Sequence, residues 1–126
     1  MNEVKVTERG WAGHLCCSDG CKFRRNTLLE YEDKKWIVST VGAYVSQRNQ
    51  IEEIGLGRYY ETMAFVGKPS NVDGYTYIDA DVSNEIYFDS EWAIPYCGGD
   101  SDEKANQMHE NVIKELSEKI RVTTKN

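Results

Sequence analysis

Apolar and polar residues alternate through much of the first ninety positions, which is the pattern of strands with one buried face. Residues 23–32 alternate in this way, and residues 34–45 are rich in the β-branched and aromatic side chains that favour strands. The polar residues Glu32, Asp33 and Lys34 supply a turn where the two segments meet. We therefore predict a β-hairpin over this part of the chain.

Further strands are expected on both sides of this hairpin. The polar, glycine-terminated segment 46–57 is interpreted as an excursion between two strands. Turn signals at 68–74 and at the pair Ser83 and Asn84 divide the alternating pattern that follows. The additional strands predicted from these boundaries are 11–17, 58–66, 75–82 and 85–89.

The last quarter of the chain changes to helical spacing. Asp100, followed three positions later by Glu103, has the pattern of a capping box at the start of a helix over 101–120. One face of this helix collects the apolar residues Ala105, Met108, Val112, Ile113, Leu116 and Ile120. His109 falls within the same arc, so we expect it to be buried and bonded to the sheet, with a tyrosine hydroxyl or His14 as its partner.

Together these elements predict an α+β fold. A single amphipathic helix needs a surface for its apolar stripe, and the sheet is the obvious one. We therefore expect one domain over 1–126, with one antiparallel sheet of about five to six strands (residues 11–94) and a C-terminal amphipathic helix packed on one face. Because a small sheet tends to cover or pair its exposed edges, a homodimer is also an expected arrangement.

The composition is that of a globular protein, with 40% hydrophobic residues among 126. No stretch approaches the roughly eighteen apolar residues that a membrane-spanning helix needs. The first residues, MNEVKVTERG, lack the apolar core of a secretion signal. We therefore expect a soluble protein of the host cell cytosol that makes no contact with a membrane.

The net charge of −6 is distributed unevenly along the chain. Residues 1–70 hold ten Lys and Arg against nine Asp and Glu, whereas residues 71–103 hold nine acidic residues and no basic one. Such a block repels phosphate backbones, so we expect no direct binding of nucleic acid. It is either a solvated flank or a surface that meets a basic partner protein.

Three of the four cysteines lie close together with a histidine near the N-terminus. His14, Cys17 and Cys21 could bind zinc with Cys16 or Cys97 as the fourth ligand, but their spacing differs from that of a zinc knuckle. A reactive thiol at Cys17 or Cys21, activated by His14 or by the neighbouring arginines, is a second possibility. Without a secretion signal, reduced cysteines that act as packing residues explain this stretch adequately.

Two carboxylates on one strand offer another kind of metal site. Asp79 and Asp81 are two positions apart, which places them on the same face of a strand. With His14 or Glu61 they could hold a divalent ion and support hydrolysis. The alternative is an ordinary pair of acidic residues on the solvent face of an edge strand.

The set that we consider the most informative is an arginine-rich and aromatic one. Arginine binds phosphate or carboxylate with two hydrogen bonds, and aromatic rings stack on flat ligands. Trp36 and Tyr60 flank this set, which could alternatively be structural if Arg24 or Arg25 pairs with Glu61 or Asp79. The expected ligand-binding patch, with no cofactor and no catalytic residue, consists of Trp11, His14, Arg24, Arg25, Arg58, Tyr59 and Glu61.

Several of these segments, taken together and in order, are similar to a known family. The stretches RGWAGH, FRRNTLL, VSTVG and RYYETMAF resemble small uncharacterised proteins associated with bacteriophages and mobile elements. The resemblance runs over residues 9–116 and implies an intracellular accessory protein, but it brings no catalytic residues.

The function predicted from these features is stoichiometric binding rather than catalysis. A protein of this kind could counter host defence by sequestering an anionic nucleotide-like ligand or by capping a host protein. The alternatives are a divalent-metal hydrolase that uses Asp79, Asp81 and His14, and a structural interaction module without a small-molecule ligand.

Overall fold

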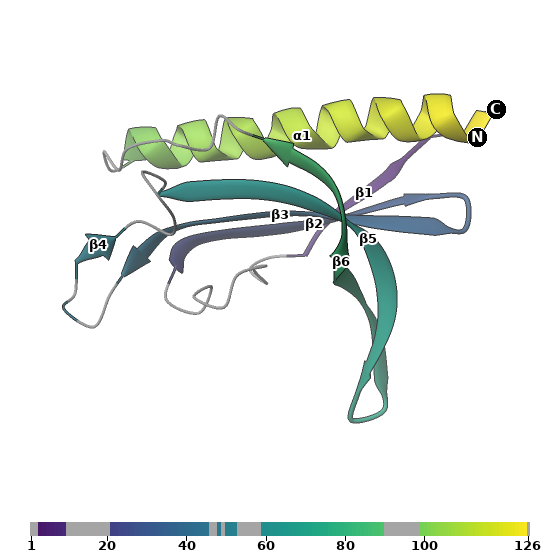
Figure 1. Ribbon diagram of the computed structural model, residues 1–126, viewed down its shortest axis with the longest axis horizontal. Helices are drawn as coiled ribbons and strands as arrows, with labels where there is room; N and C mark the ends of the chain where they lie inside the picture. Colours follow the sequence, from purple (N-terminus) through teal and green to yellow (C-terminus); the bar gives the residue numbers. More distant parts are fainter. Residues whose placement is uncertain are drawn as a thin grey trace.

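The computed structural model describes residues 3–9, 21–45, 48, 50–52, 59–89 and 99–125 of the chain. It shows one antiparallel sheet with a single helix lying along one face (Figure 1), which confirms the predicted α+β fold. No helix among these residues is both long enough and apolar enough to cross a membrane. The elements are β1 (Lys5–Glu8), β2 (Cys21–Tyr31), β3 (Lys34–Val45), β4 (Ile51–Glu52), β5 (Tyr60–Val72), β6 (Tyr75–Asp89) and α1 (Gly99–Lys125).

The strand order is β1-β2-β3-β5-β6, and the short β4 pairs with β3. The predicted hairpin of β2 and β3 is confirmed, with Tyr31 opposite Lys34 and a tight turn in which Glu32 has a φ of 58°. β4 lies inside the segment that was predicted to be an excursion between strands. The predicted strand at 11–17 lies outside the described residues.

The hairpin of β5 and β6 is longer than the sequence pattern predicted. The turn expected over 68–74 is confined to Asp73 and Gly74, which have φ values of 51° and 85°. Two adjacent residues with positive φ form the type of turn that matches the twist of a two-stranded ribbon. β5 therefore continues through Pro69, which stands opposite Ile78.

The predicted turn at Ser83 and Asn84 is wrong, because β6 runs without a break from Tyr75 to Asp89. The ladder between β5 and β6 shifts register twice between Ala64 and Gly67, and these irregularities take up the extra residues of β6. The Asp81 carboxylate accepts hydrogen bonds from the Ser83 backbone N–H and hydroxyl. The polar residues that resemble a turn in the sequence thus belong to a bulge.

The helix α1 begins at Gly99, before the predicted cap at Asp100, and extends beyond the predicted end at residue 120. Its six predicted apolar residues are all buried. They pack in two groups against β2, β3 and β5. One group centres on Leu29, Val38 and Leu116, and the other on Tyr60 and Met108. In the second group, the rings of Phe23 and Tyr60 meet edge to face at 5.7 Å.

The opposite face of the sheet is also covered. Ile37, Val41 and Phe65 alternate with the residues that face the helix, and all three are almost fully buried. The hairpin of β5 and β6 bends away from the helix and projects from the body of the molecule (Figure 1). The sheet is therefore strongly curved, with the helix packed on one face and the β5–β6 hairpin bent toward the opposite side.

Candidate functional site

The most chemically organised place in the described structure is a row of polar side chains between the two apolar groups, which is buried except for Glu8 at its outer end. His109 on α1 is fully buried, as predicted. Its partners are two threonines of the sheet and not the expected tyrosine: Nε2 lies 2.7 Å from the Thr27 hydroxyl and Nδ1 lies 2.6 Å from the Thr40 hydroxyl. Thr27 also contacts Glu8 at 2.8 Å, and Thr40 contacts Thr62 at 2.7 Å. We call these five residues the His109 network.

The hydrogen bonds of the His109 network all run in one direction. The Glu8 carboxylate can only accept, so the Thr27 hydroxyl donates to it and must itself accept from Nε2–H of His109. The neutral imidazole then accepts at Nδ1 from the Thr40 hydroxyl. Thr40 in turn accepts from Thr62. The network therefore fixes the tautomer of His109 and satisfies both ring nitrogens.

The electrostatic surroundings keep this histidine neutral. Burial of the imidazole, together with the nearby positive charge of Arg25, lowers the pKa of His109 to about 3, although the Glu8 carboxylate acts in the opposite direction. A general base must exchange protons near the working pH, and its nitrogen must reach a substrate. His109 meets neither condition, so the arrangement acts as a structural link between α1 and the sheet.

The outer end of the network is closed by an arginine. Arg25 Nη2 lies 2.7 Å from Glu8 on β1 and 2.7 Å from Glu110 on α1. Burial acts to lower the pKa of Arg25, but its bonds to these two carboxylates outweigh burial and raise it. Burial likewise acts to raise the pKa of Glu8, but the bonds from Arg25 and Thr27 hold it below its usual range. Arg25 thus joins three elements of the fold through structural ion pairs.

The sheet separates the members of the predicted ligand-binding patch that the structure describes. Arg25 faces the helix, so its neighbour Arg24 faces the other side of the sheet. Arg24 lies in one row with Val41 and Glu61. Glu61 also faces away from the helix, because the adjacent Tyr60 donates a hydrogen bond to Asp102 on α1. The prediction of one continuous patch is therefore wrong for Arg25.

The alternative prediction, that these arginines form internal ion pairs, named the wrong partners for Arg25. Arg25 pairs with Glu8 and Glu110 and not with Glu61 or Asp79. Tyr59 is half-buried and packs against the group of Tyr60 and Met108. The patch residues Trp11, His14 and Arg58 lie outside the described residues.

The predicted metal sites are described only in part. Cys21 is buried at the start of β2, while Cys16, Cys17 and Cys97 lie outside the described residues. Asp79 is exposed and accepts a hydrogen bond from the Ala80 N–H, and Asp81 lies 3.9 Å from Lys68. Within the described ranges, no three His, Cys, Asp or Glu side chains are grouped closely enough to hold a metal ion. The zinc site and the hydrolase site both stay predictions.

A second polar contact, which the sequence did not reveal, attaches the bent hairpin to the other side of the sheet. Arg9 donates from Nε to Asn26 Oδ1 at 2.9 Å and from Nη1 to the Ile78 carbonyl at 2.6 Å. Pro69, the partner of Ile78 in the ladder, has no N–H to offer that carbonyl. Burial lowers the pKa of Arg9, an effect that the nearby Asp79 carboxylate offsets in part. Arg9 therefore clamps β6 to β2 although two strands separate them in the sheet.

Beyond this clamp the hairpin carries exposed aromatic and acidic residues. We call residues 68–80 the arm. Tyr75 and Tyr77 are 78% and 42% exposed, and strand alternation places them on one face of β6 with Asp79. Asp73 at the tip is exposed as well. The alternation of Tyr77 with Asp79 was visible in the sequence, but the projection of the arm depends on the bulge and on Arg9, which local patterns do not show.

Comparison with known proteins adds no relative to this description. The chain matches no protein-family model, no curated protein and no solved structure.

Proposed function

We propose that this protein acts by stoichiometric binding and that the arm holds a protein partner. The observation that carries the proposal is the exposure of Tyr75 and Tyr77 on a hairpin that projects from the body of the molecule (Figure 1). Tyrosine is enriched in the central residues of protein interfaces, because its ring buries a large area and loses little side-chain entropy. Exposed as they are, these rings contribute little to the stability of the isolated chain.

The charge of the arm supports a basic partner. Asp73, Asp79 and Glu85 are exposed on β6 and its turn, and Lys68 is the one basic residue between positions 59 and 103. Carboxylates at this density attract a basic protein surface over the distance of a Debye length and repel nucleic acid. We therefore propose a protein with a basic surface as the partner.

The geometry around His109 and Arg25 supports a role without catalysis. Both ring nitrogens of His109 are bonded to threonines, and the Arg25 guanidinium is held by two carboxylates. Following the resemblance to proteins of bacteriophages and mobile elements, we propose that the chain serves as an accessory protein in the host cytosol. Its role there would be to cap a host defence protein.

Affinity capture with matched variants tests the proposal. The unaltered chain, a Tyr75→Ser and Tyr77→Ser double variant, and a Val6→Ser control are used as baits in a lysate of the host bacterium. Val6 is 51% exposed on β1, so the control removes exposed apolar surface away from the arm. We expect a basic protein that is retained by the unaltered chain and the control but not by the double variant.

The captured protein is then purified and titrated by calorimetry. We expect one-to-one binding whose affinity falls as salt is added. The double variant should bind with at least tenfold lower affinity, which is the effect typical of removing central interface residues. The proposal is wrong if the double variant retains the same proteins as the control, or if the purified partner binds both variants equally.

A further inference from the structure

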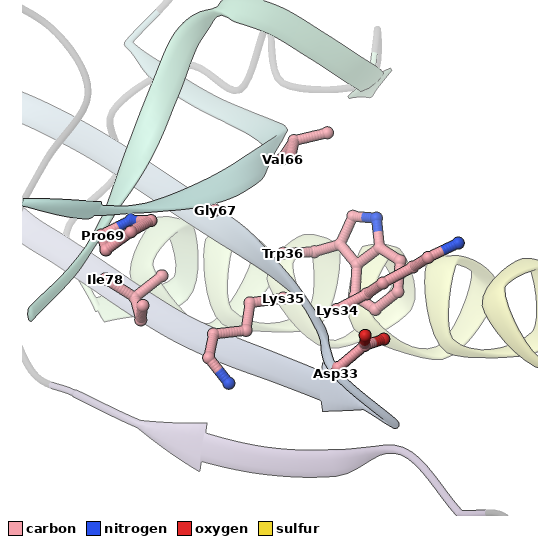
Figure 2. A pocket seen from close by; sticks show the side chains of 8 residues that line it. All are labelled: Asp33, Lys34, Lys35, Trp36, Val66, Gly67, Pro69 and Ile78. Atoms are coloured by element: carbon pink, nitrogen blue, oxygen red, sulfur yellow. The ribbon is translucent and has the colours of Figure 1, made fainter.

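A groove lies in the angle between the tip of the β2–β3 hairpin and the base of the arm. Its volume is about 660 Å³, within the range of pockets that bind small molecules. Figure 2 shows Asp33, Lys34 and Trp36 on one side of it and Pro69 and Ile78 on the other. We call it the Trp36 groove.

The shape of the Trp36 groove follows from the point at which β5 leaves β3. The ladder between these strands ends at the pair Trp36 and Val66, within the stretch where the ladder between β5 and β6 is irregular. At Gly67 a Cβ atom would lie 2.7 Å from Ile78 Cγ2 and 3.3 Å from Lys35 Cβ. A glycine is therefore needed for β5 to pass this closely between the two neighbours.

The lining of the groove indicates the chemistry of its ligand. Trp36, Val66, Pro69 and Ile78 form the apolar lining. The indole of Trp36 is partly buried, because it also packs against the core group of Leu29, Val38 and Leu116, and the part that remains exposed offers an aromatic surface to a ligand. The polar lining consists of Lys34, Lys35 and Asp33. Lys35 is engaged with Glu30 at 2.9 Å. The exposed Lys34 has no ion-pair partner among the residues that the structure describes, so its ammonium group is available to a ligand.

We propose that the Trp36 groove binds a small organic anion with a flat apolar ring system. The ring stacks on the indole between the apolar walls, and a carboxylate or phosphate group contacts the ammonium group of Lys34. Such a site is independent of the tyrosines of the arm, so the failure of one proposal leaves the other standing.

The test uses 2-naphthoate as the anionic probe and 2-naphthamide as its neutral counterpart of the same shape. Binding to the unaltered chain is followed by two-dimensional NMR, in which the indole N–H of Trp36 gives a signal of its own. We expect 2-naphthoate to shift this signal together with the amides of Lys34 and Gly67. We expect the neutral probe to bind about two- to fivefold more weakly, the loss typical of one exposed charge contact.

Three variants locate the contacts. Lys34→Met keeps the aliphatic stem but removes the charge. It should therefore weaken the binding of 2-naphthoate by the same two- to fivefold and leave the binding of 2-naphthamide unchanged. Lys114→Met, which removes an exposed lysine of α1, is the matched control and should change neither probe. Val66→Trp should block both probes by filling the groove. A parallel titration with 2-naphthyl phosphate distinguishes the two anion types, since the preferred anion binds more tightly.

Two results would overturn the proposal. One is the absence of any shift at Trp36 and Gly67 in the unaltered chain at millimolar 2-naphthoate, which requires no variant to fold. The other is equal affinity of the unaltered chain for the anionic and the neutral probe, which would show that Lys34 does not select for charge.

Discussion

Lowering the pH should destabilise this protein before its carboxylates begin to titrate, because His109 is buried in its neutral form. Histidine in the unfolded chain titrates near pH 6.5, whereas the folded environment lowers the pKa of His109 to about 3. Between these values the unfolded state binds a proton that the folded state does not, so the free energy of unfolding falls as the pH falls. Above pH 6.5 the imidazole is neutral in both states, and its contribution to stability is complete.

The expected loss can be estimated from this difference in pKa. Each pH unit inside the window changes the free energy of unfolding by about 1.4 kcal/mol per proton. Between pH 7.5 and pH 5 the loss amounts to about 2 kcal/mol, a large part of the roughly 5–15 kcal/mol that stabilises a typical domain. The pKa of Glu8 is held below its usual 4.5, so its contribution is complete above that pH and is lost only in more acidic solution. The range from pH 5 to 7.5 therefore isolates the histidine.

Urea unfolding followed by circular dichroism at pH 5, 6 and 7.5 measures this effect. In the variant His109→Gln, the amide can donate to Thr27 and accept from Thr40 without titrating, so most of the acid-induced loss should disappear. His14→Gln removes the one other histidine of the chain and should retain the loss. The reasoning is refuted if the unaltered chain and His109→Gln lose the same free energy between pH 7.5 and pH 5.

Two further predictions concern the polar contacts of the sheet. Thr40→Val keeps the shape of the side chain but leaves Nδ1 of His109 without a donor and Thr62 without an acceptor, so we expect a loss of about 1–3 kcal/mol in urea unfolding at pH 7.5. A loss below about 0.5 kcal/mol would mean that these hydrogen bonds are replaced by others. Arg9→Met removes the donor to the Ile78 carbonyl, so the amides of the arm should exchange hydrogen faster than in the unaltered chain while those of α1 keep their protection. Unchanged exchange in the arm would show that Arg9 does not hold it.

The His109 network also explains how the helix finds its position on the sheet. Apolar side chains pack against one another in many registers, and the stripe of α1 offers repeated Val, Ile and Leu. A shift of the helix by one turn would carry His109 away from Thr27 and Thr40 and leave buried donors and acceptors without partners. Each such group costs about 1–3 kcal/mol, so the polar row selects one register.

Local patterns in the sequence predicted the elements that depend on residues near one another in the chain. The alternation in 23–32 and 34–45 gave the central hairpin, and the helical spacing from Ala105 to Ile120 gave the buried face of α1. The polar pair Ser83 and Asn84 misled this reasoning, because a bulge and a turn use the same residue types. Only the pairing with β5 decides between them.

The candidate sites required the tertiary structure. The sequence placed His109 on the apolar face of the helix, but the threonines that bond it are 82 and 69 positions away. Arg9 has no local feature that distinguishes it from other arginines, and its role depends on β6 curving back to within reach of β2. Two of the three arginines of the predicted patch are separated by strand alternation, which brings Arg25 to the helix and Arg24 to the opposite face.

The sequence by itself determined the class of the fold, the buried face of the helix and the burial of His109. These features follow from the spacing of apolar residues, which is a pattern among residues only a few positions apart in the chain. The tertiary structure decided the partners of His109 and Arg25, the bend of the arm and the Trp36 groove. Hydrogen bonds and ion pairs depend on distances of about 3 Å between atoms that come from distant segments. The path of the chain sets those distances, and residue types alone do not.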